Sequence, residues 1–374
     1  MNFHANDSRF MARALQLARN GWFTTRSNPR VGCVLVKQIS SDDNGSSLII
    51  GQGWHQVPGQ AHAEVNAILD AHRLGHDTRG ATAYVTLEPC SHFGKTPPCS
   101  QALIKAGVKK VICAMKDPNS QVAGRGIQML REAGIEVDYG LMQEEAEALN
   151  AGFIKRMLKG LPRVVAKMAV SVDGRTAMAS GESQWITGEQ ARAEVQSLRA
   201  QSGAVITGSG TVLYDNPSMN VRAESFINNE YFEQPLRVII DSKQRVSPDA
   251  NIFKPNGRCW LVCADSTTEQ FPENVESRVI ETDGGFIKLE SLLRQLAVEG
   301  VNDVLVEAGS DLLGAFLQQG LVDELQIFMA PKLLGSAAKP MAKLPFDAMR
   351  QAINLKLQDV RQIGQDLKFI YTVE

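Results

Sequence analysis

The sequence of 374 residues lacks several features that mark common classes of protein. It has no apolar run near the roughly 20 residues that a membrane-spanning helix needs. Its N-terminal stretch carries scattered charges and lacks the apolar segment of a secretory signal, so we expect a cytoplasmic protein. Lys plus Arg number 39 and Asp plus Glu number 41, which gives a net charge of −2. A chain so close to neutral has no overall field that would attract nucleic acid or an anionic membrane.

Cysteine is also scarce, with six residues in the whole chain. In a reducing compartment, cysteines pack, bind metals or catalyse more often than they form disulfides. Cys90 and Cys99 lie in a loop that contains proline and glycine, beside His92. The other four lie within short apolar runs typical of β-strands, where we expect them to pack as small hydrophobic residues: Cys33, Cys113, Cys259 and Cys263.

A length of 374 residues with 44% hydrophobic content predicts about two domains, each with its own core. We expect the boundary at Gly160-Leu161-Pro162, which gives domains over residues 1–160 and 161–374. Residues 1–160 carry 18 basic and 14 acidic side chains, and the remainder carries 21 and 27. Neither domain is therefore a basic platform for nucleic acid.

Hydrophobic periodicity predicts alternating strands and helices in both domains, which favours parallel sheets covered by helices. Residues 222–236 are expected to form a mobile surface excursion. In the first domain we expect a hairpin over 31–36 and 47–54, helices over 9–20, 61–75, 97–107 and 144–160, and strands over 83–89 and 108–115. In the second domain we expect helices over 189–203 and 310–320, and strands that begin near residues 163, 204, 237, 259, 303, 323 and 366.

One group of residues in the first domain has the composition of a zinc site. His62 and Glu64 open a predicted helix, and Cys90 and Cys99 follow in the loop after a strand. Catalytic zinc takes three protein ligands and leaves one position to water, whose pKa then falls to about 7. The imidazole and two thiolates would supply these ligands, and Glu64 would move protons without binding the metal. The alternatives are a structural zinc site, or a capping histidine and two loop thiols without metal.

The order His-x-Glu and then Pro-Cys is close to the pattern of zinc-dependent base deaminases, although eight residues separate the two cysteines here instead of two. The loop PCSHFGKTPPC (89–99) resembles that of the bifunctional riboflavin-biosynthesis deaminase/reductase family, the RibD or RibG type. NPRVGCVLV (28–36), GQGWHQVPGQAHAE (51–64) and DPNSQVAGRG (117–126) resemble other parts of the family pattern. The resemblance runs from Phe10 to Phe369, with a departure at Ser120, where the family commonly has proline.

This resemblance implies a deaminase domain with a cytidine-deaminase-like, three-layer αβα fold. It implies that His62, Cys90 and Cys99 bind one zinc ion and that Glu64 is the catalytic proton shuttle. Amide and carboxylate groups suit the edges of a pyrimidine, whereas lysine and histidine suit a ribose phosphate. The substrate shell implied by the family comprises Asn28, His55, His92, Lys95, Asp117 and Asn119.

The second domain lacks the Gly-x-Gly-x-x-Gly fingerprint of a standard dinucleotide-binding fold. Two segments, 206–217 and 304–316, nevertheless lead from a predicted strand into a glycine turn. In the second of these, the helix after Gly309 would offer free N–H groups to a phosphate. From the residues alone, ordinary turns between strand and helix are the favoured interpretation of these glycines.

KMAVSVDGRTAMASGESQWIT (167–187) resembles the reductase domain of the same family, which is an α/β domain built like dihydrofolate reductase. Arginine and serine side chains suit a phosphate group. The substrate contacts implied by the family are Ser183, Arg199, Met219, Arg222 and Glu307. We also expect Lys167, at the end of a predicted strand, to lie near the reacting ribose carbon. The implied NADPH contacts are Ala169, Trp185, Thr211, Asp215, Ser242, Gly309, Ser310, Asp311, Leu312, Leu313, Gly314 and Ala315.

The resemblance implies two reactions of riboflavin biosynthesis on a small molecule. The first domain would hydrolytically deaminate 2,5-diamino-6-ribosylamino-4(3H)-pyrimidinone 5′-phosphate. The second would reduce the ribosyl group with NADPH to give 5-amino-6-ribitylamino-uracil 5′-phosphate. The family also implies a homo-oligomer, with a dimer favoured.

Two alternatives remain open on the sequence. One is a nucleoside or polynucleotide base deaminase with an accessory reductase-like domain, although no stripe of interleaved aromatic and basic residues supports a nucleic-acid substrate. The other is a zinc-stabilised binding module, which would need a fourth protein ligand.

Overall fold

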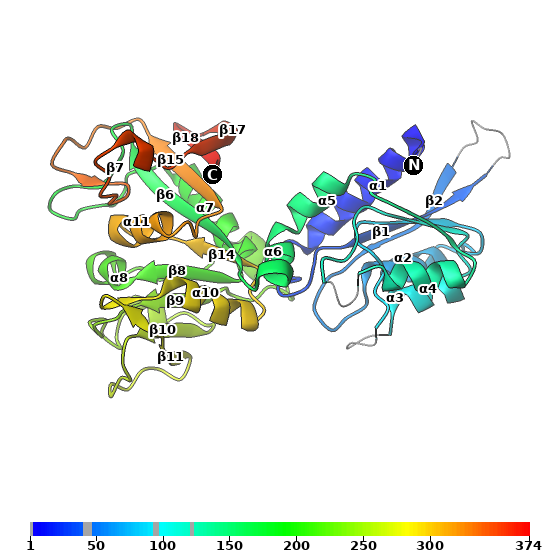
Figure 1. Ribbon diagram of the computed structural model, residues 1–374, viewed down its shortest axis with the longest axis horizontal. Helices are drawn as coiled ribbons and strands as arrows, with labels where there is room; N and C mark the ends of the chain where they lie inside the picture. The colour runs from blue at the N-terminus through cyan, green and yellow to red at the C-terminus, as the bar shows by residue number, and fades with distance from the viewer. Residues whose placement is uncertain (1–2, 40–46, 93–96, 120–122) are drawn as a thin grey trace. The chain divides into compact units, whose positions relative to one another are not determined.

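The computed structural model describes residues 3–39, 47–92, 97–119 and 123–374 (Figure 1). The chain divides into two compact units, Met1–Lys159 and Gly160–Glu374, each with its own hydrophobic core. Gly160 has a φ of 64°, a left-handed conformation that glycine adopts at little steric cost. Among the described residues, no helix has the length and apolar character that crossing a membrane requires.

The first unit is built on a five-stranded sheet in the order β2-β1-β3-β4-β5. β1 is antiparallel to β2 and β3, which confirms the expected hairpin, whereas β3, β4 and β5 are parallel to one another. The parallel pairs bring the carboxyl ends of β3 and β4 to the same edge of the sheet. The strands are β1 (Gly32–Gln38), β2 (Ser47–Trp54), β3 (Thr82–Val85), β4 (Lys110–Cys113) and β5 (Glu136–Tyr139).

Helices cover both faces of this sheet (Figure 1). On one face, α1 approaches so closely that a Cβ on Gly32 would lie 2.0 Å from the Ala14 carbonyl oxygen. On the other face, a Cβ on Gly53 would lie 2.5 Å from the Ala67 backbone nitrogen of α2. The result is a three-layer αβα unit. Its helices are α1 (Ala5–Ala18), α2 (Ala63–Arg73), α3 (Cys99–Lys105), α4 (Arg125–Glu132), α5 (Gln143–Leu149) and α6 (Ala151–Lys159), and a 3₁₀ segment covers Arg19–Gly21.

The single helix expected over 144–160 is wrong, because α5 and α6 are separate helices that meet at Asn150. The buried Asn150 side chain accepts a hydrogen bond from the Arg30 N–H at 2.8 Å and donates to the Arg30 carbonyl at 3.0 Å. A side chain that satisfies another segment's backbone in this way competes with continuous helix.

The second unit is built on a nine-stranded sheet in the order β11-β10-β9-β8-β14-β6-β15-β18-β17. Neighbouring strands from β11 to β15 are parallel, and β18 and β17 form an antiparallel edge. The strands are β6 (Arg163–Ser171), β8 (Ala204–Gly208), β9 (Leu236–Ile240), β10 (Cys259–Cys263), β11 (Val275–Val279), β14 (Asp303–Val306), β15 (Glu324–Ala330), β17 (Leu355–Ile363) and β18 (Asp366–Val373). Two short ladders pair β7 (Arg175–Ala177) with β16 (Lys339–Pro340) and β12 (Thr282–Asp283) with β13 (Phe286–Ile287).

Alternate residues of the central strands face opposite sides of this sheet. Val304 and Val306 of β14 pack in one core with α10 and α11, whereas Leu305 packs in another core with α7. Helices on both faces are typical of a mainly parallel sheet. The helices are α7 (Glu189–Gln201), α8 (Ser209–Asp215), α9 (Glu224–Ile227), α10 (Leu289–Val298) and α11 (Ser310–Gln318), with 3₁₀ segments at Asn251–Phe253 and Met349–Gln351.

The stretch 222–236 contains the short helix α9, which the sequence did not predict. Gln234 connects the end of this stretch to Val221, because its side chain accepts from the Val221 N–H at 2.8 Å and donates to the Val221 carbonyl at 2.7 Å. Elsewhere, the four cysteines expected in the core are all buried, which confirms that prediction.

Candidate active sites

Three segments of the first unit bring the candidate zinc ligands together. His62 is the residue before α2 and has extended backbone, with φ −76° and ψ 169°. Cys90 follows β3, and Cys99 is the first residue of α3. The Cys99 N–H donates to the Cys90 sulfur at 3.2 Å, so the beginning of α3 also stabilises negative charge on that sulfur.

The spacing of the donor atoms fits a zinc ion. His62 Nδ1 lies 3.2 Å from Cys99 Sγ and 3.7 Å from Cys90 Sγ, and all three donor atoms lie within 4.8 Å of one another. Tetrahedral zinc with bonds of 2.0–2.3 Å holds such donors about 3.5 Å apart. Within the described residues, this group has three members, which fits an open coordination position better than a closed structural site.

The charges around these ligands favour a divalent cation. The hydrogen bond with Cys99 lowers the pKa of Cys90 to about 4, and His62 adds to this effect while burial opposes it. The same hydrogen bond, together with burial, raises the pKa of Cys99. A metal ion bound to both sulfurs would displace any proton that they carry.

Glu64 lies beside this group without belonging to it. It is the second residue of α2, and its side chain is 3% exposed. Burial, followed by the negative charge of Cys90, raises the pKa of Glu64 to about 7. A carboxyl group with a pKa near neutrality can both accept and release a proton, as general acid–base catalysis requires.

Of the predicted substrate residues, His55 lies next to His62, and Asn28 contacts His55. The ring centre of His55, a buried residue, is 5.1 Å from that of His62. His55 Nε2 lies 2.9 Å from Asn28 Nδ2, and its Nδ1 lies 3.3 Å from the Ala61 carbonyl oxygen. A ring that accepts from Asn28 and donates to Ala61 is neutral, in agreement with burial, which lowers the pKa of His55 to about 4.

Asp117 and Asn119 lie on the segment that follows β4. The Asn119 N–H donates to the Asp117 carboxylate at 2.8 Å. Burial raises the pKa of Asp117, while this hydrogen bond and the charge of His92 act in the opposite direction. His92 is exposed and lies within electrostatic reach of Asp117. The predicted contact at Lys95 lies outside the described residues.

The sequence analysis missed Glu88, which precedes Pro89 and Cys90. Its carboxylate is 4% exposed and accepts hydrogen bonds from backbone N–H groups between residues 117 and 127. The available signal was an acidic residue at the end of the otherwise apolar run AYVTL (83–87). A buried carboxylate needs such partners, because it is costly without them.

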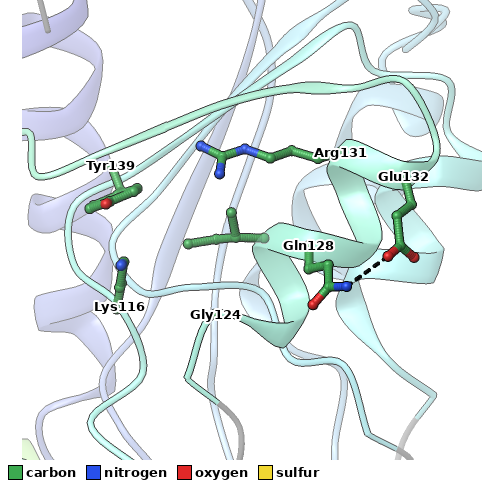
Figure 2. Close-up of a pocket in the computed structure, with 7 residues that line it drawn as sticks. Lys116, Gly124, Gln128, Arg131, Glu132 and Tyr139 are labelled. Carbon is green, nitrogen blue, oxygen red and sulfur yellow. Dashed lines mark hydrogen bonds between the residues drawn. The ribbon is translucent and has the colours of Figure 1, made fainter.

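A separate hollow of about 420 Å³ lies beside α4 (Figure 2). Figure 2 shows Arg131 of α4 extending toward Tyr139, and Lys116 Nζ lies 4.2 Å from the Tyr139 ring centre. The exposed Glu132 accepts a hydrogen bond from Gln128 at 2.8 Å. None of the candidate zinc ligands lines this hollow, so it is distinct from the candidate zinc site.

In the second unit, four predicted substrate residues form one cluster. Arg199 of α7 donates to both carboxylate oxygens of Glu307, from Nε at 2.6 Å and from Nη2 at 3.0 Å. Lys167 Nζ, from β6, lies 4.0 Å from the same carboxylate. Arg199 Nη1 also donates to the Asn220 carbonyl at 3.1 Å, and Nη2 lies 3.6 Å from the Met219 sulfur. The cluster lies where β14 ends, because Glu307 follows its last residue.

The charges of this cluster are set by its ion pairs. Burial acts to raise the pKa of Glu307, but Arg199 outweighs it and lowers that pKa, with further effects from Lys167 and Arg222. Burial lowers the pKa of Lys167, and Glu307 opposes this change. Three cations around one carboxylate suit an anionic ligand such as a phosphate.

The predicted NADPH contacts lie on several elements of the second unit. Ser183 Oγ donates to the Asp215 carboxylate at 2.7 Å, which joins a predicted substrate contact to a predicted cofactor contact. Trp185 is 59% exposed, and the Arg192 guanidinium carbon lies 4.6 Å from its ring centre. Three further predicted contacts lie in β6, in α8 and after β9: Ala169, Thr211 and Ser242.

Open space adjoins the residue that precedes α11, whereas much of the helix is packed. A Cβ on Gly309, the residue before α11, would meet no atom within 4 Å among the described residues. Leu313 is fully buried, and a Cβ on Gly314 would lie 2.3 Å from the Lys343 carbonyl oxygen. Within 309–315, the backbone N–H groups of the first turn are therefore the part that suits a phosphate.

Two buried polar atoms near this region lack a hydrogen-bond partner within the described residues. They are Thr207 Oγ1, at the end of β8, and Asn220 Oδ1, next to Met219. Buried polar groups are hydrogen-bonded as a rule, so these atoms suit a polar ligand. The residues present thus fit a dinucleotide and a phosphorylated substrate, and the sequence analysis missed both Thr207 and Asn220.

The two sites define a class of protein: a zinc-dependent deaminase joined in one chain to a nucleotide-dependent reductase. Residues 4–115 match the cytidine and deoxycytidylate deaminase zinc-binding region, and residues 162–369 match the RibD C-terminal domain. The riboflavin biosynthesis protein RibD of Escherichia coli is 48% identical over 369 residues, which cover 96% of this chain and 98% of that protein. RibD of Haemophilus influenzae is 46% identical over 381 residues, which cover 100% and 99%.

Solved structures are similar over the same extent. Acinetobacter baumannii RibD, form 1, has a TM-score of 0.88 and 44% identity, with 98% of this chain and 99% of that chain covered. The diaminohydroxyphosphoribosylaminopyrimidine deaminase/5-amino-6-(5-phosphoribosylamino)uracil reductase of Thermotoga maritima has a TM-score of 0.86 and 34% identity, with the same coverage. The chain belongs to the RibD family, the bifunctional deaminase/reductases of riboflavin biosynthesis. The family's cofactors are zinc in the deaminase domain and NADPH in the reductase domain.

Proposed function

We propose that the first unit, with a boundary near residue 160, hydrolyses 2,5-diamino-6-ribosylamino-4(3H)-pyrimidinone 5′-phosphate with release of ammonia. The second unit then reduces the ribosyl group of the product to a ribityl group, which gives 5-amino-6-ribitylamino-uracil 5′-phosphate. The observation that carries the proposal is the three-donor group of His62, Cys90 and Cys99 beside the buried Glu64.

In the deaminase, His62, Cys90 and Cys99 would hold one zinc ion, which when bound lowers the pKa of water to about 7. Glu64 takes a proton from the attacking water and delivers it to the leaving amine. A pKa of about 7 suits both the uptake and the release of this proton, because the Glu64 carboxyl group is then partly protonated and partly ionised near neutral pH.

The remaining deaminase residues bind and orient the substrate. His55 is held neutral between Asn28 and Ala61, so it offers a fixed pattern of donor and acceptor atoms next to the zinc ligands. Asp117 and Asn119 read the edges of the pyrimidine, and His92 and Lys95 bind the ribose phosphate.

In the reductase, NADPH would supply a hydride to the ribosyl carbon, a step that depends on how closely the protein holds the two reactants. Arg199, held by Glu307, binds the substrate with Arg222, and Lys167 lies near the reacting carbon. Ser183 and Met219 complete the substrate contacts. The cofactor contacts are Ala169, Trp185, Thr211, Asp215, Ser242 and the segment Gly309, Ser310, Asp311, Leu312, Leu313, Gly314 and Ala315, whose first turn receives a phosphate.

We also propose that the protein acts in the cytoplasm as a homo-oligomer, with a dimer favoured. Support for self-association comes from β17, an edge strand that exposes Leu355, Leu357 and Val360 by 40%, 52% and 49%. Natural edge strands are usually protected against pairing with other chains. Sedimentation equilibrium tests this proposal, and a monomer at all concentrations would contradict it.

One assay tests both reactions. The purified protein is incubated with the pyrimidine phosphate and NADPH while ammonia release and NADPH absorbance are followed. We expect ammonia to appear first and NADPH oxidation to depend on it. Ammonia release from metal-free protein, or NADPH oxidation with the undeaminated substrate at the same rate, would overturn the proposal.

A further inference from the structure

The Glu88 carboxylate is the centre of a hydrogen-bond cluster that the reactions proposed above do not use. Its side chain is almost fully buried and is not a member of the candidate ligand group of His62, Cys90 and Cys99. It accepts four backbone hydrogen bonds, two at each oxygen: from Asp117 (3.2 Å) and Gly124 (2.9 Å) at Oε2, and from Gly126 (3.0 Å) and Ile127 (3.2 Å) at Oε1. One side chain thus holds both the segment after β4 and the first turn of α4.

The backbone around Glu88 is in direct contact with the same segment. The Glu88 N–H donates to the Met115 carbonyl at 2.9 Å. A Cβ on Gly126 would lie 1.9 Å from the Pro89 carbonyl oxygen, so α4 approaches the chain just before Cys90 as closely as glycine allows. The residues on either side of Glu88 therefore cannot move independently of the segment that bears Asp117.

Cys90 has other anchors as well. Its carbonyl accepts hydrogen bonds from Ser100, from the backbone N–H at 3.2 Å and from Oγ at 3.0 Å. Its sulfur belongs to the candidate metal group.

At the far end of α4, Arg131 Nη2 donates to the Val137 carbonyl at 2.7 Å, in the region that Figure 2 shows. Glu88 is thus the side chain that holds the beginning of α4 and Asp117 against the zinc loop.

We propose that Glu88 is a positioning residue of the deaminase, which fixes the substrate-binding segment with Asp117 relative to the zinc ligand Cys90. The inference rests on the proposed deaminase function. Cys90 has hydrogen bonds with Cys99 and Ser100 of α3 and would also bind the metal, so loss of the Glu88 carboxylate releases the substrate side of the site more than the metal side. The main effect is therefore on substrate binding, and zinc stays bound.

Glu88→Gln tests this inference, because the amide has the same shape but turns an NH₂ group toward two N–H donors that need an acceptor. Glu88→Asp retains the acceptor charge on a shorter side chain. Glu132→Gln is the matched control, since it removes one carboxylate from the exposed side of the same helix. For each variant we would measure deaminase KM and kcat, zinc content, reductase rate on the deaminated substrate, and amide hydrogen exchange at Gly126 and Ile127.

For Glu88→Gln we expect KM to rise roughly 10- to 100-fold, the range seen when groups that orient a site are removed. We expect kcat within a few-fold of the control, one zinc ion per chain, faster exchange at the two amides and an unchanged reductase rate. Glu88→Asp should recover part of the lost affinity. Should Glu88→Gln fail to fold, a raised KM with zinc retained in Glu88→Asp would support the inference.

An unchanged KM in both Glu88 variants would overturn the inference. So would a fall in kcat that merely follows the loss of zinc or of folded protein while KM stays constant, because that pattern describes structural support alone. Absence of ammonia release from the wild-type enzyme would instead overturn the proposed function. The exchange rates at Gly126 and Ile127 separate the two cases, since they report the hold of Glu88 on α4 without any substrate.

Discussion

The two units hold their reactive groups by different means. In the first unit, the candidate site gathers sulfur, imidazole and carboxyl groups. Burial and the charge of Cys90 raise the pKa of Glu64 to about 7, and the hydrogen bond with Cys99 lowers that of Cys90 to about 4. In the second unit, an ion pair between Arg199 and Glu307 keeps both groups charged. The first site is therefore poised to exchange protons and bind a cation, whereas the second presents fixed charge to an anion.

The difference also concerns how each site is assembled. The candidate zinc ligands come from 38 consecutive residues, His62 to Cys99, at the starts of two helices and after one strand. The reductase cluster joins β6, α7 and the end of β14, so its members are up to 140 positions apart from Lys167 to Glu307. When the residues of a site are close in the sequence, as in the first unit, their spacing forms a recognisable motif. When the sheet brings distant segments together, as in the second unit, no such motif exists.

Removal of zinc should divide the two activities most sharply. Exhaustive dialysis against a chelator is expected to reduce ammonia release below detection, because the water nucleophile then keeps its ordinary pKa. The reductase rate on the deaminated substrate should stay within twofold, since its site relies on ion pairs. Re-addition of zinc is the control and should restore ammonia release; a parallel loss of both activities would contradict the separation of the two sites.

Glu64→Gln should have the next largest effect. We expect deaminase kcat to fall roughly 10²- to 10⁴-fold, the range for loss of a general acid–base group. Zinc content should persist, because Glu64 is not among the three donors. Measurements of ammonia release, bound zinc and reductase rate on the same preparation check this prediction. A variant that deaminates at the normal rate would exclude Glu64 as the proton shuttle.

Arg199→Lys tests the fixed charges of the second site. Lysine keeps the positive charge but cannot donate to both Glu307 oxygens and to the Asn220 carbonyl at once. We expect reductase kcat/KM to fall roughly 100-fold, in line with the loss of a charge-assisted hydrogen bond worth about 1.5–3 kcal/mol. Ammonia release should be unaffected. An equal loss in both reactions would point to general destabilisation instead.

Sequence patterns predicted many of the strands and helices, because hydrophobic periodicity reflects which residues are buried, but they did not predict α10, β11 or β17. They missed the break between α5 and α6, which depends on hydrogen bonds between Asn150 and Arg30, 120 positions apart. They also missed α9 within 222–236. In that stretch, the Gln234 side-chain amide forms two hydrogen bonds with the backbone of Val221, the residue just before it. Tertiary hydrogen bonds of this kind override local propensity and leave no local trace.

The sites show the same limit. His62, Cys90 and Cys99 could be singled out from residue type and spacing, whereas the reductase residues rested on family resemblance alone. Glu88 escaped both approaches, because its partners are backbone N–H groups that every residue except proline possesses. A side chain that acts on the backbone of a distant segment becomes visible only when the fold is known.

The smallest expected effect concerns the pH dependence of stability in the first unit. His55 has a folded-state pKa of about 4, below its ordinary value near 6.5, because burial disfavours the charged ring. Its contribution to stability is therefore fully present above pH 6.5 and is lost as the pH falls toward 4. Between pH 7 and pH 5 the free energy of unfolding of the wild-type first unit should fall by roughly 1–2 kcal/mol, a loss that His55→Gln should not show because glutamine does not titrate.

Urea titrations followed by amide protection in β1 to β3 measure this difference, with peptides of the second unit as the internal reference. Identical pH slopes in the two proteins would mean that His55 is not held neutral, and the contrast between a proton-exchanging site and a fixed-charge site would then rest on Glu64 and Cys90 alone.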